Sequence, residues 1–163
     1  MKKLICVCVL AALFLMTGCS ADERDYFSPF KQGFVAQLEG TFRGMAFAAR
    51  LEMEALQANG SEREATLIFY APESIADTVL ARRADGTMTL SSGGVTVGAP
   101  EGYAALFSLF PISGEVVEVS LQDEITCVVG RGFSLYFDGD GTPTEVANEH
   151  GSARILSFSE QKG

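Results

Sequence analysis

The chain has 163 residues, with 21 acidic side chains against 12 basic ones and a net charge of −9. This length suits a single domain, and with 47% hydrophobic residues the chain has enough apolar side chains for one core. The acidic balance argues against nucleic acid or an anionic lipid surface as a partner, because both attract clusters of lysine and arginine.

The first 18 residues have the order of an export signal. Lys2 and Lys3 precede an almost wholly apolar run at residues 4–16. As a helix this run spans only about 20 Å, against roughly 30 Å for the hydrocarbon core of a membrane, so it is too short for a comfortable span. We expect residues 1–18 to be a signal peptide.

The segment Leu15-Met16-Thr17-Gly18-Cys19 resembles the lipobox of bacterial lipoproteins, with Met16 where that pattern prefers leucine. The resemblance implies cleavage between Gly18 and Cys19 and attachment of lipid to the Cys19 thiol. Two acyl chains anchor a protein firmly, since each buried methylene contributes about 0.8 kcal/mol. The expected location is the extracytoplasmic face of a bacterial cell membrane, in a Gram-positive cell. The alternatives are an ordinary cleaved signal and an uncleaved anchor.

Loss of the signal changes the charge and the cysteine content of the chain. Without its two lysines, 10 basic side chains remain against 21 acidic ones, which gives a net charge of −11. Cys6 and Cys8 leave with the signal and Cys19 carries lipid, so Cys127 is the one remaining thiol. We therefore expect no internal disulfide.

A short tether precedes the domain. Residues 19–25 are polar and acidic after the lipidated cysteine, and they show no periodicity. Aromatic residues become frequent from Tyr26 onward, which is unusual for a free linker. We expect a single β-rich domain at residues 26–163.

Alternation of apolar and polar residues predicts strands in the first half of this domain. Residues 34–42 and 45–53 alternate and meet at Arg43-Gly44, the pattern of a β-hairpin. A helix is the competing interpretation for Met45–Leu56, which is rich in helix-forming residues. Further strands are predicted at 64–70, 78–83, 87–90 and 95–97.

Residues 100–110 predict the one amphipathic helix of the chain. Pro100 suits the first helical position, and Pro111 ends the pattern. The apolar residues recur at helical spacing, at Tyr103, Leu106, Phe107 and Phe110. Because so short a helix is stable only against another apolar surface, we expect it to pack on the sheet.

The remainder of the chain predicts five more strands, at 115–121, 125–129, 133–137, 144–147 and 154–158. About 8–11 strands with short connections favour a mainly β (α+β) fold. We expect a curved antiparallel sheet or half-open β-barrel, with the helix of about residues 100–110 on its concave side.

This order of elements resembles the LolA-like lipoprotein-carrier fold, and also small uncharacterised lipoproteins of Gram-positive gut bacteria. The resemblance depends on the long hairpin, the middle helix and three segments, which are Phe69-Tyr70-Ala71-Pro72-Glu73-Ser74-Ile75, Asp85-Gly86 and Gly141-Thr142-Pro143. It implies an unclosed barrel that faces helices and can hold acyl chains in the gap between them.

No catalytic motif is present in the sequence. His150 is the only imidazole and lies in a predicted turn, and no Gly-x-Ser-x-Gly elbow exists. Asp138–Gly141 lacks the further oxygen ligands of a calcium loop and predicts a hairpin turn. Cys127, within a predicted strand, is expected to be a buried and inert thiol. We expect no enzymatic activity, no cofactor and no metal.

Two functional hypotheses follow. In the first, the protein binds or carries a lipid or another small apolar ligand in a trough bordered by Phe34, Phe47, Phe69, Tyr103 and Phe107. In the second, it is a non-catalytic envelope module that presents its acidic surface to a partner protein. An ordinary core would also account for the aromatic residues, so the trough is the less economical interpretation of them.

The lipobox generates the first prediction. Cys19→Ser should abolish incorporation of labelled palmitate, because no other thiol lies at the cleavage site. Cys127→Ser is the matched control and should retain the label. Label remaining on Cys19→Ser at the wild-type level would show that the protein is not lipidated at this cysteine.

Overall fold

The structure is a computed structural model that describes residues 24–58, 62–100 and 102–161. The predicted signal peptide, the lipidation site Cys19 and most of the tether lie outside the described residues. Among the described helices, none has the length and apolar character needed to cross a membrane.

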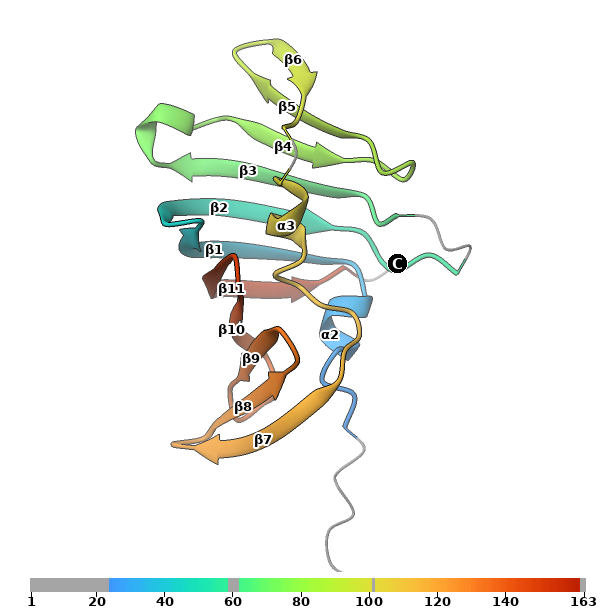
Figure 1. The fold of residues 1–163 in the computed structure, drawn as a ribbon, viewed down its shortest axis with the longest axis vertical. Coiled ribbons are helices and arrows are strands. Elements are labelled where there is room, and N and C mark those ends of the chain that lie inside the picture. The colour runs from blue at the N-terminus through green and yellow to red at the C-terminus, as the bar shows by residue number, and fades with distance from the viewer. Residues whose placement is uncertain (1–23, 59–61, 101, 162–163) are drawn as a thin grey trace, which may run out of the picture.

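The described strands form one antiparallel sheet of eleven, in the order β6-β5-β4-β3-β2-β1-β11-β10-β9-β8-β7 (Figure 1). Each predicted strand is present, with ends shifted by three residues at most. The mainly β fold class is thereby confirmed. The strands are β1 (Phe34–Phe42), β2 (Met45–Met53), β3 (Ala65–Ala71), β4 (Val79–Arg82), β5 (Met88–Ser92), β6 (Val95–Gly98), β7 (Val116–Gln122), β8 (Ile125–Gly130), β9 (Phe133–Phe137), β10 (Pro143–Asn148) and β11 (Gly151–Glu160).

The hairpin of β1 and β2 is the longest hairpin of the described strands. It runs in register from Phe34 opposite Met53 to Phe42 opposite Met45. The turn residues Arg43 and Gly44 have φ values of 49° and 81°, which give the hairpin the twist that matches its strands. The strand interpretation of this region is confirmed over the helical one, because alternate side chains of both strands enter the core.

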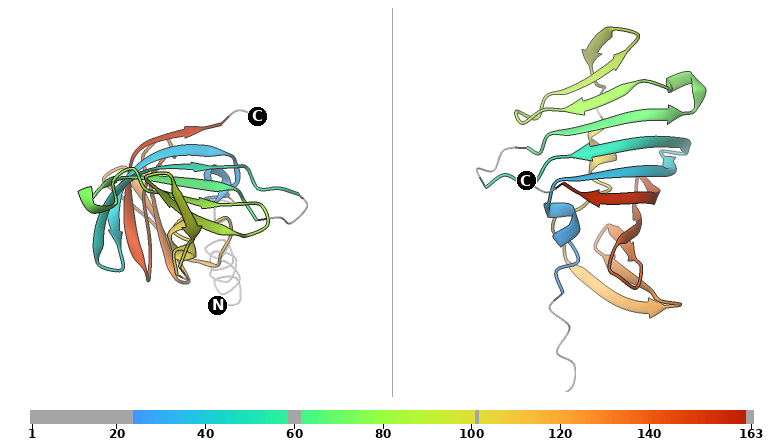
Figure 2. Two further views of the ribbon diagram at one scale, coloured as in Figure 1. Left: turned by 90° about the horizontal axis from the view of Figure 1, so that it is seen from above. Right: turned by 180° about the vertical axis from the view of Figure 1, so that it is seen from behind.

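The pairing of β1 with β11 joins the two halves of the sheet. At Gly40 and Gly151 the two backbones approach so closely that an added Cβ would overlap a carbonyl oxygen of the other strand. Beyond β11 the strands β10 to β7 turn away from the direction of the upper strands (Figures 1 and 2). The glycines therefore permit the close contact at which the sheet changes direction.

The two edge strands, β6 and β7, follow each other in sequence and lie at opposite ends of the sheet. Their connection, Ala99–Glu115, is called the strap here, and it crosses one face of the sheet (Figure 1). Ten strand spacings cover about 48 Å if the sheet is flat, whereas the extended strap reaches at most about 56 Å. The sheet is curved and the strap crosses its concave side, so the real span is shorter than this flat distance. The strap therefore has room for the turns and the helical turn that it contains.

The helix within the strap, α3 (Ala104–Phe107), is a single turn and is shorter than the predicted helix of about residues 100–110. Gly102 has a φ of 97°, which interrupts a helix, and an added Cβ there would lie 2.7 Å from Nη1 of Arg43. Backbone hydrogen bonds between residues three apart continue beyond α3, from the N–H of Leu109 to Leu106 and from that of Phe110 to Phe107. The α-helix thus begins after Gly102 and gives way to tighter turns before Pro111.

The strap nevertheless buries the apolar residues that the pattern identifies. Its buried side chains are Leu106, Phe107, Leu109 and Phe110. They pack over residues of the first three strands, namely Leu38, Phe47, Leu51 and Leu67. The helix α3 therefore packs on the concave side of the sheet, as predicted.

A second short helix, α2 (Ser28–Lys31), precedes β1 and was not predicted. Its Phe30 is fully buried and contacts the rings of Phe34, Phe110 and Phe158 at centroid distances of 6.1, 6.0 and 6.3 Å. All buried apolar side chains of the described residues lie between Phe27 and Ile155. A chain that starts at Ser20 therefore retains the whole described core.

Asp25, which the sequence assigns to the tether, fixes the start of α2. Its carboxylate accepts hydrogen bonds from Lys31 Nζ at 2.6 Å and from the backbone N–H of Phe27 at 3.1 Å. The bond from Lys31 is the main cause that lowers the pKa of Asp25. Two hydrogen bonds thus connect Asp25 to α2 and to the residue before it.

The strap generates the second prediction. Phe107→Ala should lower the free energy of unfolding by about 3 kcal/mol, because a ring that is only 3% exposed is removed from a packed core. Urea denaturation measures the change. Leu121→Ala on β7, where the side chain is 74% exposed, is the control and should cost less than about 0.5 kcal/mol. Equal effects of the two substitutions would mean that the strap is not packed on the sheet.

Candidate functional site

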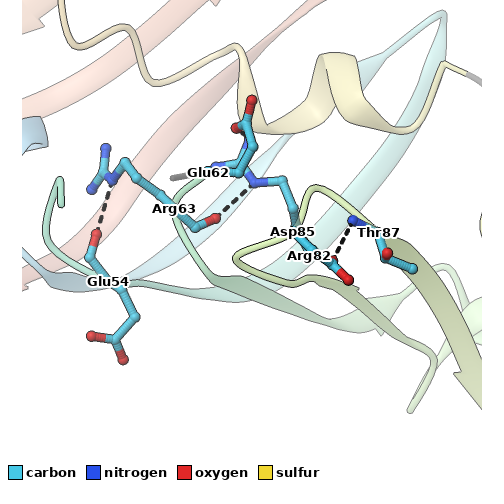
Figure 3. A network of polar contacts seen from close by, with 6 residues as sticks. All are labelled: Glu54, Glu62, Arg63, Arg82, Asp85 and Thr87. Carbon is cyan, nitrogen blue, oxygen red and sulfur yellow. Dashed lines mark hydrogen bonds and ion pairs between the residues drawn. The ribbon is translucent and has the colours of Figure 1, made fainter. Parts of the chain in front are cut away.

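Two arginines lie side by side where β3 begins and β4 ends. Arg63 precedes β3 and is only 5% exposed, and Arg82 is the last residue of β4, opposite Ala65. This register brings together two cations that are far apart in the sequence (Figure 3).

Backbone carbonyl groups hold both guanidinium groups in place. Arg63 donates from Nε to the carbonyl oxygen of Glu54 at 2.9 Å and from Nη2 to that of Gln32 at 3.1 Å. Arg82 donates from Nε to the carbonyl oxygen of Arg63 at 2.8 Å (Figure 3). These bonds go to neutral carbonyl oxygens, so they do not neutralise the positive charges of the pair.

Acidic groups compensate this charge only weakly. Glu62 lies 3.6 Å from Nη1 of Arg82, and its side chain is 62% exposed. Among the described residues, no carboxylate forms an ion pair with Arg63. The carboxylate of Glu54 points away from the Arg63 guanidinium (Figure 3). The pair therefore retains an excess of positive charge in a protein that is acidic overall.

The effect of burial appears in the pKa values. Desolvation lowers the pKa of Arg63 to about 10, and repulsion from Arg82 acts in the same direction. Desolvation also lowers the pKa of Arg82, while attraction to Glu62 opposes this shift. Both side chains remain cationic at neutral pH, so the cost of burying their charge persists.

Aromatic rings supply part of the missing stabilisation. The guanidinium carbon of Arg82 lies 4.9 Å from the ring centroid of Phe107, and that of Arg63 lies 5.9 Å from the centroid of Phe34. Such cation–π contacts are worth about 0.5–2 kcal/mol. The contact with Phe107 also connects the end of β4 to the strap.

A half-open hollow of about 520 Å³ lies beside these arginines. The sheet side contributes Met53, Leu56, Glu62, Arg63 and Arg82, and the strap contributes Ala104, Phe107, Ser108, Phe110, Pro111, Ile112 and Ser113. This set is called the strap hollow here. Its volume falls in the range of roughly 300–1,000 Å³ that is usual for small-molecule sites.

The five residues predicted to border a trough occupy a different place. Phe34, Phe47, Phe69 and Phe107 are buried, and Tyr103 is partly buried against the core. The space under the strap, which Phe47 and Phe107 line, is about 10 Å³. This is close to the minimum for one water molecule. Ligand binding at those five residues stays a prediction, and it requires the strap to move outward.

Of those five residues only Phe107 lines the strap hollow. The sequence does not single out the two arginines, because each stands among other charged residues in a pattern typical of a solvated surface. A signal exists only in the pairing of β3 with β4, which no local pattern reveals.

The other candidate residues from the sequence, Asp138, His150 and Cys127, lie in turns or in strand pairs. The Asp138 carboxylate accepts the backbone N–H groups of Asp140 and Thr142 at 3.0 and 2.8 Å, which confirms a hairpin turn. His150 lies in the turn between β10 and β11. Cys127 is partly buried and lies opposite Tyr136. Its charge interaction with Tyr136 is the largest cause that raises the pKa of that tyrosine. Within the described ranges, no cluster of histidine, cysteine and carboxylates could hold a metal ion.

No family model matches the chain, and no curated protein matches it in sequence. Solved structures do share its fold. MucB aligns with a TM-score of 0.51 at 17% identity over 88% of this chain, and an uncharacterized conserved protein from Thermus thermophilus aligns with 0.51 at 13% over 85% of both chains. A putative outer membrane lipoprotein-sorting protein domain from Vibrio parahaemolyticus aligns with 0.47 at 9% identity, over 81% of this chain and 86% of that domain.

The two likenesses with a TM-score of 0.51 show the fold alone, because the sequence identities are only 17% and 13%. The match covers 60% of MucB, so this chain spans about three fifths of that protein's length. The function must therefore be argued from the strap hollow and from the sequence.

The arginine pair generates the third prediction. Arg63→Met should lower the free energy of unfolding by about 2–3 kcal/mol, because two backbone carbonyl groups lose charge-assisted hydrogen bonds. Arg50→Met is the control: Arg50 pairs with Glu52 at 2.6 Å, and both side chains are well exposed, so the cost should stay below about 1 kcal/mol. Urea denaturation distinguishes the two, and a cost for Arg63→Met no larger than that of the control contradicts the role given to these bonds.

Proposed function

We propose that this protein is a lipid-anchored, non-catalytic protein of the bacterial cell envelope that binds a small lipid or other hydrophobic ligand. The observation that carries the proposal is the strap hollow of about 520 Å³. Seven of its twelve lining residues are apolar, and backbone carbonyl groups hold its two arginines in place, which suits the apolar wall and placed polar groups of a small-molecule site.

The expected anchor gives such a site access to lipid. The resemblance to a lipobox supports attachment at Cys19, and the described domain begins only five residues later, at Arg24. Five residues extend by at most about 17 Å. A domain tethered at Cys19 therefore stays close to the membrane surface, where amphiphiles are concentrated.

A second function is favoured by one specific observation, the exposure of β7. All seven residues of this edge strand are exposed, including Val117, Val119 and Leu121. An exposed edge strand offers unpaired N–H and C=O groups to which a partner can add a strand. A membrane-tethered interaction module, which presents this edge and an acidic surface to another envelope protein, is the alternative.

The experiment uses the chain from Ser20 onward, purified without detergent. Native mass spectrometry and a fluorescent fatty-acid probe report bound lipid and saturable binding. Ala104→Trp places a large ring at a position that lines the strap hollow, so it should weaken probe binding about tenfold or more. Ser157→Trp on β11, where the side chain is exposed and outside the hollow, should leave binding unchanged.

The two candidate functions differ in their outcomes. Saturable binding that Ala104→Trp removes supports the ligand-binding function. Absence of co-purified lipid together with no saturable binding overturns that function and favours the interaction module.

A further inference from the structure

The strap hollow combines an apolar wall with two buried or half-buried cations. Met53, Leu56 and Phe110 give it apolar wall, while Arg63 and Arg82 give it two fixed cations. Burying a cation without a partner anion is costly, and the usual remedy is a paired carboxylate. In this hollow, Glu62 neutralises the charge of the two arginines only in part.

The nearby acids do not neutralise the pair. Glu62 approaches Arg82 only to 3.6 Å, beyond the 2.7–2.9 Å of a good charge-assisted bond, and it is mostly exposed. Asp85 accepts the backbone N–H of Thr87 at 2.8 Å within its own turn (Figure 3). The local charge at the hollow is therefore positive, although the whole chain carries −9.

The backbone bonds fix the two cations before any ligand arrives. Each Nε is committed to a carbonyl oxygen, which sets the direction of the guanidinium group. Planar guanidinium groups that are held in this way suit the oxygen atoms of a carboxylate or a phosphate. The entropy cost of ordering these two side chains is thus already included in folding, so a ligand does not have to meet it on binding.

We infer that the strap hollow takes a single-chain amphiphile with an anionic head, whose carboxylate or phosphate oxygens bind Arg82 and Arg63 while its alkyl chain lies against the strap. This rests on the proposed function and gives the chemical class of its ligand. The volume of about 520 Å³ suits one small molecule. The anionic head of the ligand would neutralise the excess positive charge of Arg63 and Arg82.

The experiment compares ligands that share a chain and differ in the head. Hexadecanoate, hexadecyl phosphate and hexadecanol each displace the fluorescent fatty-acid probe from the chain that starts at Ser20. We expect both anionic ligands to bind about tenfold or more tightly than the neutral alcohol, and higher salt to weaken the anionic ligands only. The ratio between the carboxylate and the phosphate identifies the preferred head.

Three variants connect this difference to particular side chains. Arg82→Gln should reduce hexadecanoate affinity about tenfold more than hexadecanol affinity, since the neutral ligand responds only to the lost contact with Phe107. Glu62→Gln removes the competing carboxylate and should tighten hexadecanoate binding about twofold or more, a gain that loss of folding cannot mimic. Arg50→Gln, a cation outside the hollow, should change neither ligand.

The outcomes separate this inference from the proposed function. If hexadecanol binds as tightly as hexadecanoate, or if Arg82→Gln weakens both equally, the anionic head is wrong while the apolar site stands. If no ligand displaces the probe and the probe itself does not bind, the proposed function fails together with the inference.

Discussion

The strap is the constraint on which the rest of the structure depends. Because the edge strands β6 and β7 are neighbours in sequence and lie ten spacings apart in the sheet, their connection has to cross the whole face. The described residues of this segment form turns around a single α-helical turn. Its large apolar side chains cover the concave side of the sheet. The strap hollow lies beside them, at the ends of β2 and β4.

Polar contacts from both halves of the sheet add to the buried side chains that hold the strap. Arg82 at the end of β4 lies over the ring of Phe107, and Asn148 at the end of β10 donates from Nδ2 to Ser108 Oγ at 3.2 Å. The buried aromatic side chains of the strap provide most of its stabilisation, since each polar contact is worth about 1 kcal/mol. The arginine at the hollow is thus also part of the attachment of the strap.

The sequence predicts the strands well because apolar alternation is a local property. Phe47, Ala49 and Leu51 indicate which face of β2 is buried, and Arg43-Gly44 indicates the turn before it. The length of α3 is overestimated because the apolar pattern continues to Phe110, whereas the positive φ of Gly102 delays the start of the helix and tighter turns replace it after Phe107. Arg63 and Arg82 are missed for another reason: their proximity comes from the pairing of β3 with β4, which depends on the whole sheet.

The pairing of β1 with β11 also sets an order of events for the growing chain. Strands β1 to β6 form a meander of neighbouring segments, which can pair as soon as they are synthesised. One side of β1 stays open until Gly151–Glu160 has been made, because its partner is the last strand of the chain. Contacts of such long sequence separation form slowly, and an open strand edge is prone to aggregation. For most of its synthesis, the protein therefore carries an unpaired edge in the middle of its future sheet.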